Sequence, residues 1–334
     1  MATWKARITA ILIGSVIFLI LPLPSSAIQQ LDQQSLSEHS APIVEVEQLE
    51  ALTPSSAIAM KPIPSNMQEQ DKPKAISLDS AIRQWTQTLS EEKGFETWKK
   101  AAWTTYPLGP GTHGWVVILS KGTQEIGYLV IHAVEDGSLQ LTEYGTGEHP
   151  LFSLNTLYRS LLQQEIIPSS TSLSGFIQDE SISKQRWYRD ALNALWIIEI
   201  EQAKYLVEAK SGEVLPIDQV PDTPYKYVPN YATNLSGTSS GILLPAFDPY
   251  ERLPWVQGEP TAVNGIKELE AQLTKQPKLT YVAELFQDQV PVTLSLAVIG
   301  YQQWDSQEPY LIVDHEGPRY FPLIIAINHG EFYP

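Results

Sequence analysis

The hydrophobic pattern along the chain first becomes regular at Ser77, whose side chain suits a helix N-cap. Apolar residues then recur three or four positions apart, and Gly94 suits the position just beyond a helix C-terminus. We expect an amphipathic helix here, followed by a second, shorter helical stretch that carries Phe95, Trp98 and Ala102. These large apolar faces require a sheet to pack on.

The pattern changes from helical to strand spacing at Trp115. Residues 115–119, 126–133 and 139–144 are β-branched and aromatic runs separated by short polar turns. They predict a three-stranded antiparallel meander. Ser153 then suits the N-cap of another amphipathic helix, so the predicted order is helix, meander, helix.

Strand-like runs return between residues 195 and 209 and repeat part of the meander. Tyr128-Leu129-Val130, followed by Gly137, recurs as Tyr205-Leu206-Val207, followed by Gly212. An isolated hairpin is marginally stable, whereas paired units can bury each other's apolar faces. We therefore expect two copies of a unit made of a helix and an antiparallel hairpin, with both glycines in turns.

The repeated hairpin, with its Gly-Tyr-Leu-Val run and its Asp-Gly turn, resembles PepSY-type domains and the related propeptides of streptopain-like secreted peptidases. The resemblance covers about residues 77–216, within a domain predicted over 77–217. It implies a small PepSY- or cystatin-like α+β domain that packs against a peptidase or lies outside the membrane as a peptidase inhibitor. It offers no catalytic residues.

The chain beyond this region reads as a second domain. Residues 218–230 are rich in proline and predict a linker, and residues 231–334 predict an α+β domain with a smaller antiparallel sheet. The expected elements are a helix at 262–273, a short helical turn at 280–286, and strands at 293–304, 309–314 and 319–323. The whole chain is thus expected to be α+β with two domains.

The run Leu-Ala-Val-Ile-Gly-Tyr, followed by Tyr-Leu-Ile-Val-Asp, resembles the back half of C39-like peptidases, which have a papain fold. That family has a catalytic His before the first run and an Asp after the second. Leu294 stands in the place of the His, Asp314 matches the Asp, and the chain contains no cysteine. The resemblance therefore implies a degenerate papain-like domain without a catalytic apparatus.

The N-terminus has the features of an export signal. Lys5 and Arg7 precede an apolar run at 8–21, and small residues end at Ala27, which predicts a signal peptide over 1–27. The same run also fits a retained signal anchor, which would give membrane contact through 8–21. Residues 28–76 are acidic and rich in Pro, Gln and Ser, and predict a disordered linker. We expect a secreted or extracytoplasmic protein.

Composition narrows the chemistry further. The formal net charge is −16, which disfavours nucleic acid as a partner because that binding depends on Lys and Arg that neutralise phosphates. The absence of cysteine excludes thiol nucleophiles, disulfides and thiolate metal sites. No cofactor-binding motif is present, and none of the six histidines has a recognised metal-ligand spacing. The densest cluster, Asp314-His315-Glu316, lies at a Gly-Pro turn and is read as solvated.

One string matches a nucleophile elbow, namely Gly237-Thr238-Ser239-Ser240-Gly241. The order Ser239, Asp314, His329 would suit an α/β-hydrolase, so a secreted serine-type hydrolase is an alternative function. The context opposes this alternative because Pro245 interrupts any helix after the serine. We therefore expect no catalytic, cofactor or metal residues.

The favoured interpretation is an exported, non-catalytic protein that binds a protein or peptide partner at the cell envelope, with a structural envelope module as a further alternative. The outer strand of the meander offers unpaired backbone groups to an extended peptide. In the second domain, two aromatic residues flank a polar turn. The candidate partner-contact residues are Thr142, Tyr144, Thr146, Trp304 and Tyr310.

Overall fold

The computed structural model describes residues 76–334, apart from 135, 221–234, 236, 238 and 306. The predicted signal peptide (1–27) and acidic linker (28–76) lie outside these residues except for Ile76, as does most of the predicted linker 218–230. Within the described residues the protein is α+β and has six α-helices, a ten-stranded antiparallel sheet and a three-stranded antiparallel sheet. All described residues belong to one compact unit.

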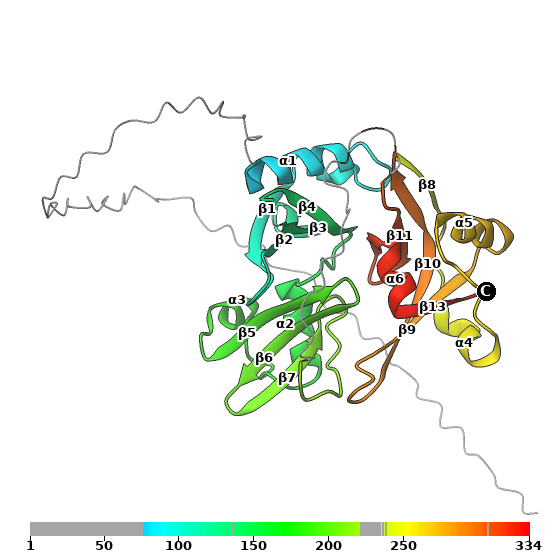
Figure 1. Cartoon of the computed structure of the whole chain (residues 1–334). Helices are drawn as coiled ribbons and strands as arrows, with labels where there is room; N and C mark the ends of the chain where they lie inside the picture. Colours follow the sequence, from blue (N-terminus) through cyan, green and yellow to red (C-terminus); the bar gives the residue numbers. More distant parts are fainter. Residues whose placement is uncertain (1–75, 135, 221–234, 236, 238, 306) are drawn as a thin grey trace, which may run out of the picture. The chain divides into compact units, whose positions relative to one another are not determined.

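The large sheet has the strand order β1-β2-β3-β4-β12-β11-β10-β9-β13, with β8 also paired to β10 (Figure 1). Its strands are β1 (Ala102–Pro107), β2 (Gly114–Lys121), β3 (Gln124–Ala133), β4 (Leu139–Thr146), β8 (Ser239–Leu243), β9 (Leu279–Leu285), β10 (Val292–Trp304), β11 (Tyr310–Asp314), β12 (Pro318–Pro322) and β13 (Gly330–Tyr333). The sheet therefore contains strands from both predicted domains. They meet where β12 pairs with β4, with Arg319 opposite Gly145 and Tyr320 opposite Tyr144.

The small sheet has the order β5-β6-β7 and follows two helices. These elements are α2 (Leu154–Gln163), α3 (Leu173–Gln178), β5 (Ile182–Asp190), β6 (Asn193–Ile200) and β7 (Ala203–Glu208). The order of elements is similar in the two regions that carry the repeated sequence. In the first region, α1 (Leu78–Leu89) and strands β1, β2 and β3 are followed by the turn at Gly137 and then by β4. In the second region, α2, α3 and strands β5, β6 and β7 are followed by the turn at Gly212. There, Val207 forms an isolated bridge with Val214 at the position that corresponds to β4.

Both repeat glycines lie in turns, as predicted. Gly137 has φ +83° and its N–H donates to Val134 O, and Gly212 has φ +79° and its N–H donates to Glu208 O. L residues, which carry a Cβ atom, rarely adopt this left-handed backbone conformation, whereas glycine does so readily. The prediction that these glycines close the two hairpins is confirmed.

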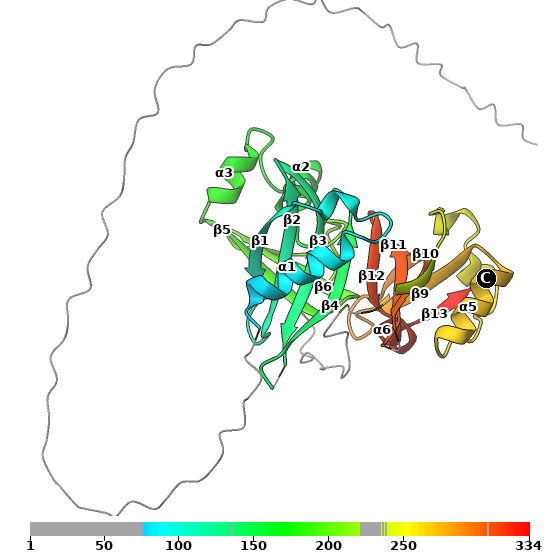
Figure 2. The same cartoon turned by 90° about the horizontal axis from the view of Figure 1, so that it is seen from above.

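The first helix, α1 (Leu78–Leu89), lies across one face of β1 to β4 (Figures 1 and 2). Its buried face includes Ile82 and Trp85, which belong to the same hydrophobic cluster as Val117 and Leu129 of the sheet. The opposite face of these strands packs on α2, α3 and the small sheet through a second cluster. The predicted N-caps are confirmed, since Ser77 accepts from Ser80 N–H and Ser153 from Thr156 N–H.

The remaining elements cover the far half of the large sheet. They are the 3-10 turn η2 (Pro249–Glu251), α4 (Pro254–Gln257), α5 (Ile266–Lys275) and α6 (Leu323–His329). A third hydrophobic cluster joins Leu195 and Leu206 of the small sheet to Leu296 and Leu311 of β10 and β11. The sheet expected for 231–334 is therefore not a separate, smaller one. It continues the first meander and shares its cores.

Several predicted elements differ from the structure. The helical stretch with Phe95, Trp98 and Ala102 is only a 3-10 turn, η1 (Glu96–Trp98), and Ala102 begins β1. Residues 280–286 are not a helical turn but form most of β9, because pairing with both β10 and β13 satisfies their backbone groups. The sequence patterns also missed α3, β5, β8, α4, α6 and β13.

Candidate functional site

The candidate site is built on the exposed edge of the large sheet. β1 is the first strand of that sheet and pairs with β2; no other described strand pairs with it. The strand at the other end, β13, is partly covered by a bridge between Thr261 and Phe332. The β1 sequence Ala-Trp-Thr-Thr-Tyr-Pro favours an extended strand because β-branched and aromatic residues pack well on a pleated surface.

The direction of the β1 backbone groups follows from one hydrogen bond. Leu108 N–H donates to Gly114 O (3.0 Å), and the register between β1 and β2 continues from this pair without a shift. Antiparallel partners alternate between pairs that exchange hydrogen bonds and pairs that do not. The even-numbered residues of β1 therefore face β2, and the N–H and C=O groups of Trp103 and Thr105 point away from the sheet.

The roof of the site is formed by α1 and the turn that follows it. Because Ile82 and Trp85 face the core, Arg83 and Gln87 lie on the exposed side of the helix. The chain then turns back through η1, where the Trp98 indole N–H donates to Ile126 O (3.2 Å) and fixes the turn against β3. This connection brings the start of β1 beneath α1.

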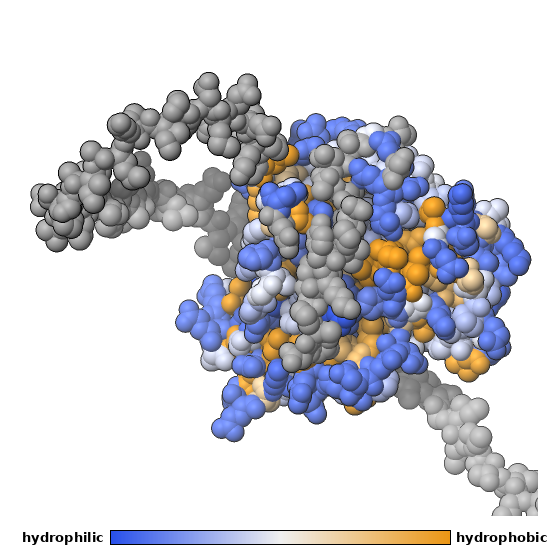
Figure 3. Space-filling model, in the orientation of Figure 1, coloured by the Kyte–Doolittle hydropathy of each residue, from blue (hydrophilic) through white to orange (hydrophobic). Residues whose placement is uncertain are grey.

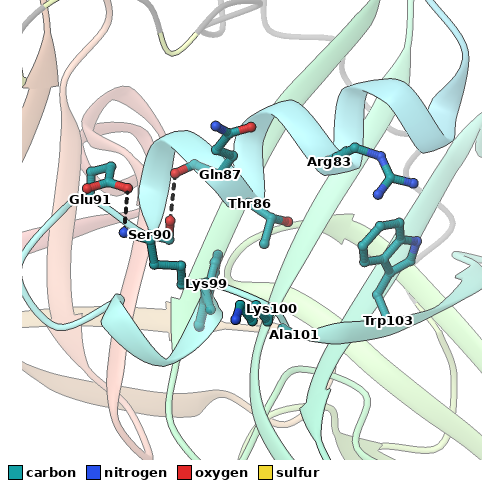
Figure 4. Close-up of a pocket in the computed structure, with 10 residues that line it drawn as sticks. Arg83, Thr86, Gln87, Ser90, Glu91, Lys99, Lys100, Ala101 and Trp103 are labelled. Atoms are coloured by element: carbon teal, nitrogen blue, oxygen red, sulfur yellow. Dashed lines mark hydrogen bonds and ion pairs between the residues drawn. The ribbon is translucent and has the colours of Figure 1, made fainter.

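Between α1 and β1 lies an open groove with a volume of about 330 Å³ (Figure 4). The Arg83 guanidinium lies 5.2 Å from the centre of the Trp103 ring, a cation–π contact that joins roof and edge strand. Lys99 and Lys100 also line the groove, and its carboxylate, Glu91, lies 3.2 Å from Lys99. The groove therefore has a positive balance on a chain whose net charge is −16.

Thr86 supplies an unsatisfied polar atom in this groove. Its side chain is buried on the groove side of α1, and its Oγ1 has no hydrogen-bond partner among the described residues (Figure 4). Leaving a buried hydroxyl without a partner costs about 1–3 kcal/mol. A ligand with a polar group at this position would recover that free energy.

The predicted partner-contact residues lie elsewhere, and most are inaccessible. Thr142 and Tyr144 are buried in β4, and Thr146 is half-buried at its end. The expectation that β4 is a free outer strand is wrong, because β12 pairs with it. Thr142 instead donates to Val130 O and contacts the His132 ring at 2.9 Å.

The two aromatic residues predicted to be exposed are also buried. Trp304 and Tyr310 are each 1% exposed, and the Tyr310 hydroxyl donates to Leu141 O at 2.7 Å. Both side chains belong to a hydrophobic cluster that also contains residues of α1, β3 and β4, so their burial follows from the continuous sheet.

The three residues of the alternative hydrolase each have a different partner. Ser239 is the first residue of β8, not a turn before a helix, and its Oγ donates to Glu92 Oε2 (2.6 Å). Asp314 Oδ1 accepts from the Gly317 N–H, and His329 Nε2 lies 3.5 Å from Asp190. No described contact joins Ser239, Asp314 and His329, so the geometry of a catalytic triad is not formed by these side chains.

A buried ionic cluster lies where β4, β12 and the small sheet meet. Arg319 Nε donates to Glu143 Oε1 at 2.7 Å, and the hydroxyls of Tyr128 and Tyr188 donate to the same carboxylate at 2.6 and 2.9 Å. Burial alone would lower the pKa of Arg319, but Glu143, Tyr128 and Glu208 together outweigh it and raise that pKa above its ordinary value. Arg319 and Glu143 are both fully buried, so the cluster is a structural junction.

Lys210 and His315 extend this junction. Lys210 Nζ donates to the backbone oxygens of His149 and Glu316, and burial, aided by the positive charge of Arg319, lowers its pKa to about 7. His315 Nδ1 accepts from Arg319, and burial lowers the pKa of His315 well below its ordinary value. The sequence reading of His315 as a solvated turn residue is therefore wrong.

Exposed hydrophobic side chains mark a second surface region. Tyr250 of η2, Val256 of α4 and Leu253 between these elements are exposed, and hydrophobic residues are visible at α4 in Figure 3. Apolar surface alone does not indicate which partner covers it. The groove at β1 is the stronger candidate because it combines free backbone groups, charge and an unsatisfied hydroxyl.

Two further features of the described ranges concern metal ions and membranes. These ranges contain no group of three or more His, Asp or Glu side chains that could hold a metal ion. None of their helices has the length and apolar character needed to cross a membrane.

No protein-family model, curated protein or solved structure matches the chain.

Proposed function

We propose that the protein is an exported, non-catalytic module that binds an extended segment of a partner protein at the cell envelope or outside the cell. The observation that supports this function is the open edge of β1 beneath α1. A peptide can add to such an edge by main-chain hydrogen bonds, while the neighbouring groove selects its side chains.

The edge carries little of the protection that natural sheets use against pairing. Such protection includes inward-pointing charges, bulges, prolines and covering elements. In β1 the register to β2 has no shift and the strand has no charged residue; Pro107 stands at its end. No other strand among the described residues pairs with the outward groups of Trp103 and Thr105, so they can accept one added strand.

The compartment and the partner class rest on sequence patterns. The segment 1–27 has the pattern of an export signal, and a retained apolar run at 8–21 would anchor the protein to the membrane. The repeated sequence, whose two copies lie in strands β3 and β7, resembles PepSY-type domains, and this resemblance supports an inhibitor- or propeptide-like role with a secreted peptidase as partner. The C-terminal half would then support the binding half.

The test uses fluorescein-labelled peptides of alternating valine and serine, valine and glutamate, or valine and lysine. Thr105→Pro removes one outward N–H from β1, whereas Thr105→Val keeps it and serves as the matched control. We expect at least one peptide to bind the unmodified protein and the Thr105→Val variant, and to lose about tenfold or more in affinity with Thr105→Pro, since one lost hydrogen bond and a clash together exceed about 1.4 kcal/mol.

Circular dichroism and urea unfolding establish whether the proline variant is folded. Equal binding by a folded Thr105→Pro variant, or no binding of any of the three peptides, contradicts strand addition at β1. The latter result favours the structural envelope module.

A further inference from the structure

We propose that the groove selects an acidic peptide, one that adds to β1 as a strand and directs carboxylates toward Arg83, Lys100 and Thr86. This inference rests on the proposed function and specifies its ligand. It commits to an extended protein segment with acidic residues at alternate positions.

The first reason is the local charge. Arg83, Lys99 and Lys100 line the groove together with Glu91, and all four side chains belong to exposed residues. Glu91 lies 3.2 Å from Lys99. Arg83 and Lys100 are exposed to solvent and form no ion pair with a carboxylate of the described residues.

The second reason is the direction of the side chains on an added strand. Trp103 lies opposite Leu119 and Thr105 lies opposite Val117, and both partners belong to the hydrophobic cluster beneath α1. Residues directly opposite each other in neighbouring strands project from the same face. Peptide residues opposite Trp103 and Thr105 therefore project toward α1, where the cations lie, and their neighbours project to the other face.

The third reason is Thr86, which lines the groove and whose buried Oγ1 has no partner among the described residues. Its hydroxyl can donate to a carboxylate, and hydrogen bonds to charged acceptors are the stronger ones. Arg83 and Trp103 form the adjacent wall, so a carboxylate near Thr86 would meet charge and a hydrogen-bond donor together (Figure 4).

The experiment compares the valine–glutamate and valine–lysine peptides by fluorescence anisotropy. We expect the acidic peptide to bind about five- to tenfold more tightly, as two exposed charge pairs allow, and to weaken as salt is raised. Arg83→Glu/Lys100→Glu should remove this preference. The matched control, Lys204→Glu/Lys267→Glu, changes the net charge equally on β7 and α5 and should keep it.

Thr86→Val tests the hydroxyl separately. It removes an unpaired polar atom at nearly constant shape, so we expect unchanged or higher stability and an acidic-peptide affinity about threefold to tenfold lower. The inference is overturned if the acidic and basic peptides bind equally to the unmodified protein. It is also overturned if Arg83→Glu/Lys100→Glu changes the preference for the acidic peptide no more than Lys204→Glu/Lys267→Glu does. If the peptides bind equally and Thr105→Pro still abolishes binding, the proposed function stands and only the acidic specificity fails. If Thr105→Pro has no effect, strand addition itself fails.

Discussion

Replacing Glu143 is expected to lower the free energy of unfolding strongly. Glu143 accepts hydrogen bonds from Arg319 Nε, Tyr128 and Tyr188 at 2.7, 2.6 and 2.9 Å, and its side chain is fully buried. The change Glu143→Gln preserves the shape of the side chain but removes the charge that compensates Arg319. Because Glu143 lies in β4 and Arg319 in β12, the change acts where the two halves of the sheet join.

Breaking one partner of a buried ion pair leaves the other charge without compensation and costs about 3–5 kcal/mol of unfolding free energy. We expect Glu143→Gln to lose that amount. Replacing both partners, as in Glu143→Leu/Arg319→Met, removes both desolvation penalties, so this double variant should regain most of the loss. Glu251→Gln, which disrupts an exposed pair with Lys278, should have a much smaller effect.

Urea unfolding followed by tryptophan fluorescence and by circular dichroism measures these differences. The two signals should change together, because the hydrophobic clusters join the small sheet, α1 and the far strands. A loss below about 0.5 kcal/mol for Glu143→Gln would place it among ordinary surface substitutions and would refute the role assigned to the junction.

Two further predictions concern Lys210 and the N-terminus. Burial lowers the pKa of Lys210 to about 7 in the folded protein, whereas an unfolded chain has a lysine pKa of about 10.4. Between about pH 7 and pH 10.4, Lys210 is therefore protonated in the unfolded state and largely neutral in the folded state. Stability should therefore rise by about 4 kcal/mol from pH 7 to pH 10 relative to Lys210→Met, and parallel pH profiles would contradict this. Secreted protein should begin at Ile28 on N-terminal sequencing, whereas an intact N-terminus in the membrane fraction would establish a signal anchor.

Sequence patterns predicted the elements whose periodicity is local. The helix after Ser77, the strands around Tyr128 and Tyr205, and the helix at Ile266 have apolar spacing that matches their buried faces. The turn glycines Gly137 and Gly212 were predictable because a left-handed backbone favours glycine. These features depend on neighbouring residues alone.

The candidate site depends on pairing between distant strands, which periodicity does not encode. β1 resembled the end of a helical stretch because Phe95, Trp98 and Ala102 are spaced three or four apart, although Trp-Thr-Thr-Tyr has a strand-like composition that could have identified it. The sequence patterns predict β4 as the outer strand of the meander, whereas in the structure it pairs with β12. The error at 280–286 has the same cause, since two neighbouring strands decide its conformation.

The most direct measurement of the central claim is amide hydrogen exchange at β1 with and without the valine–glutamate peptide. The N–H groups of Trp103 and Thr105 point away from β2, whereas that of Thr104 already faces it. At a peptide concentration about 100 times the Kd, exchange at Trp103 and Thr105 should slow by about 100-fold, with little change at Thr104. Bound peptide that leaves Trp103 and Thr105 exchanging at their free rates would contradict strand addition at β1.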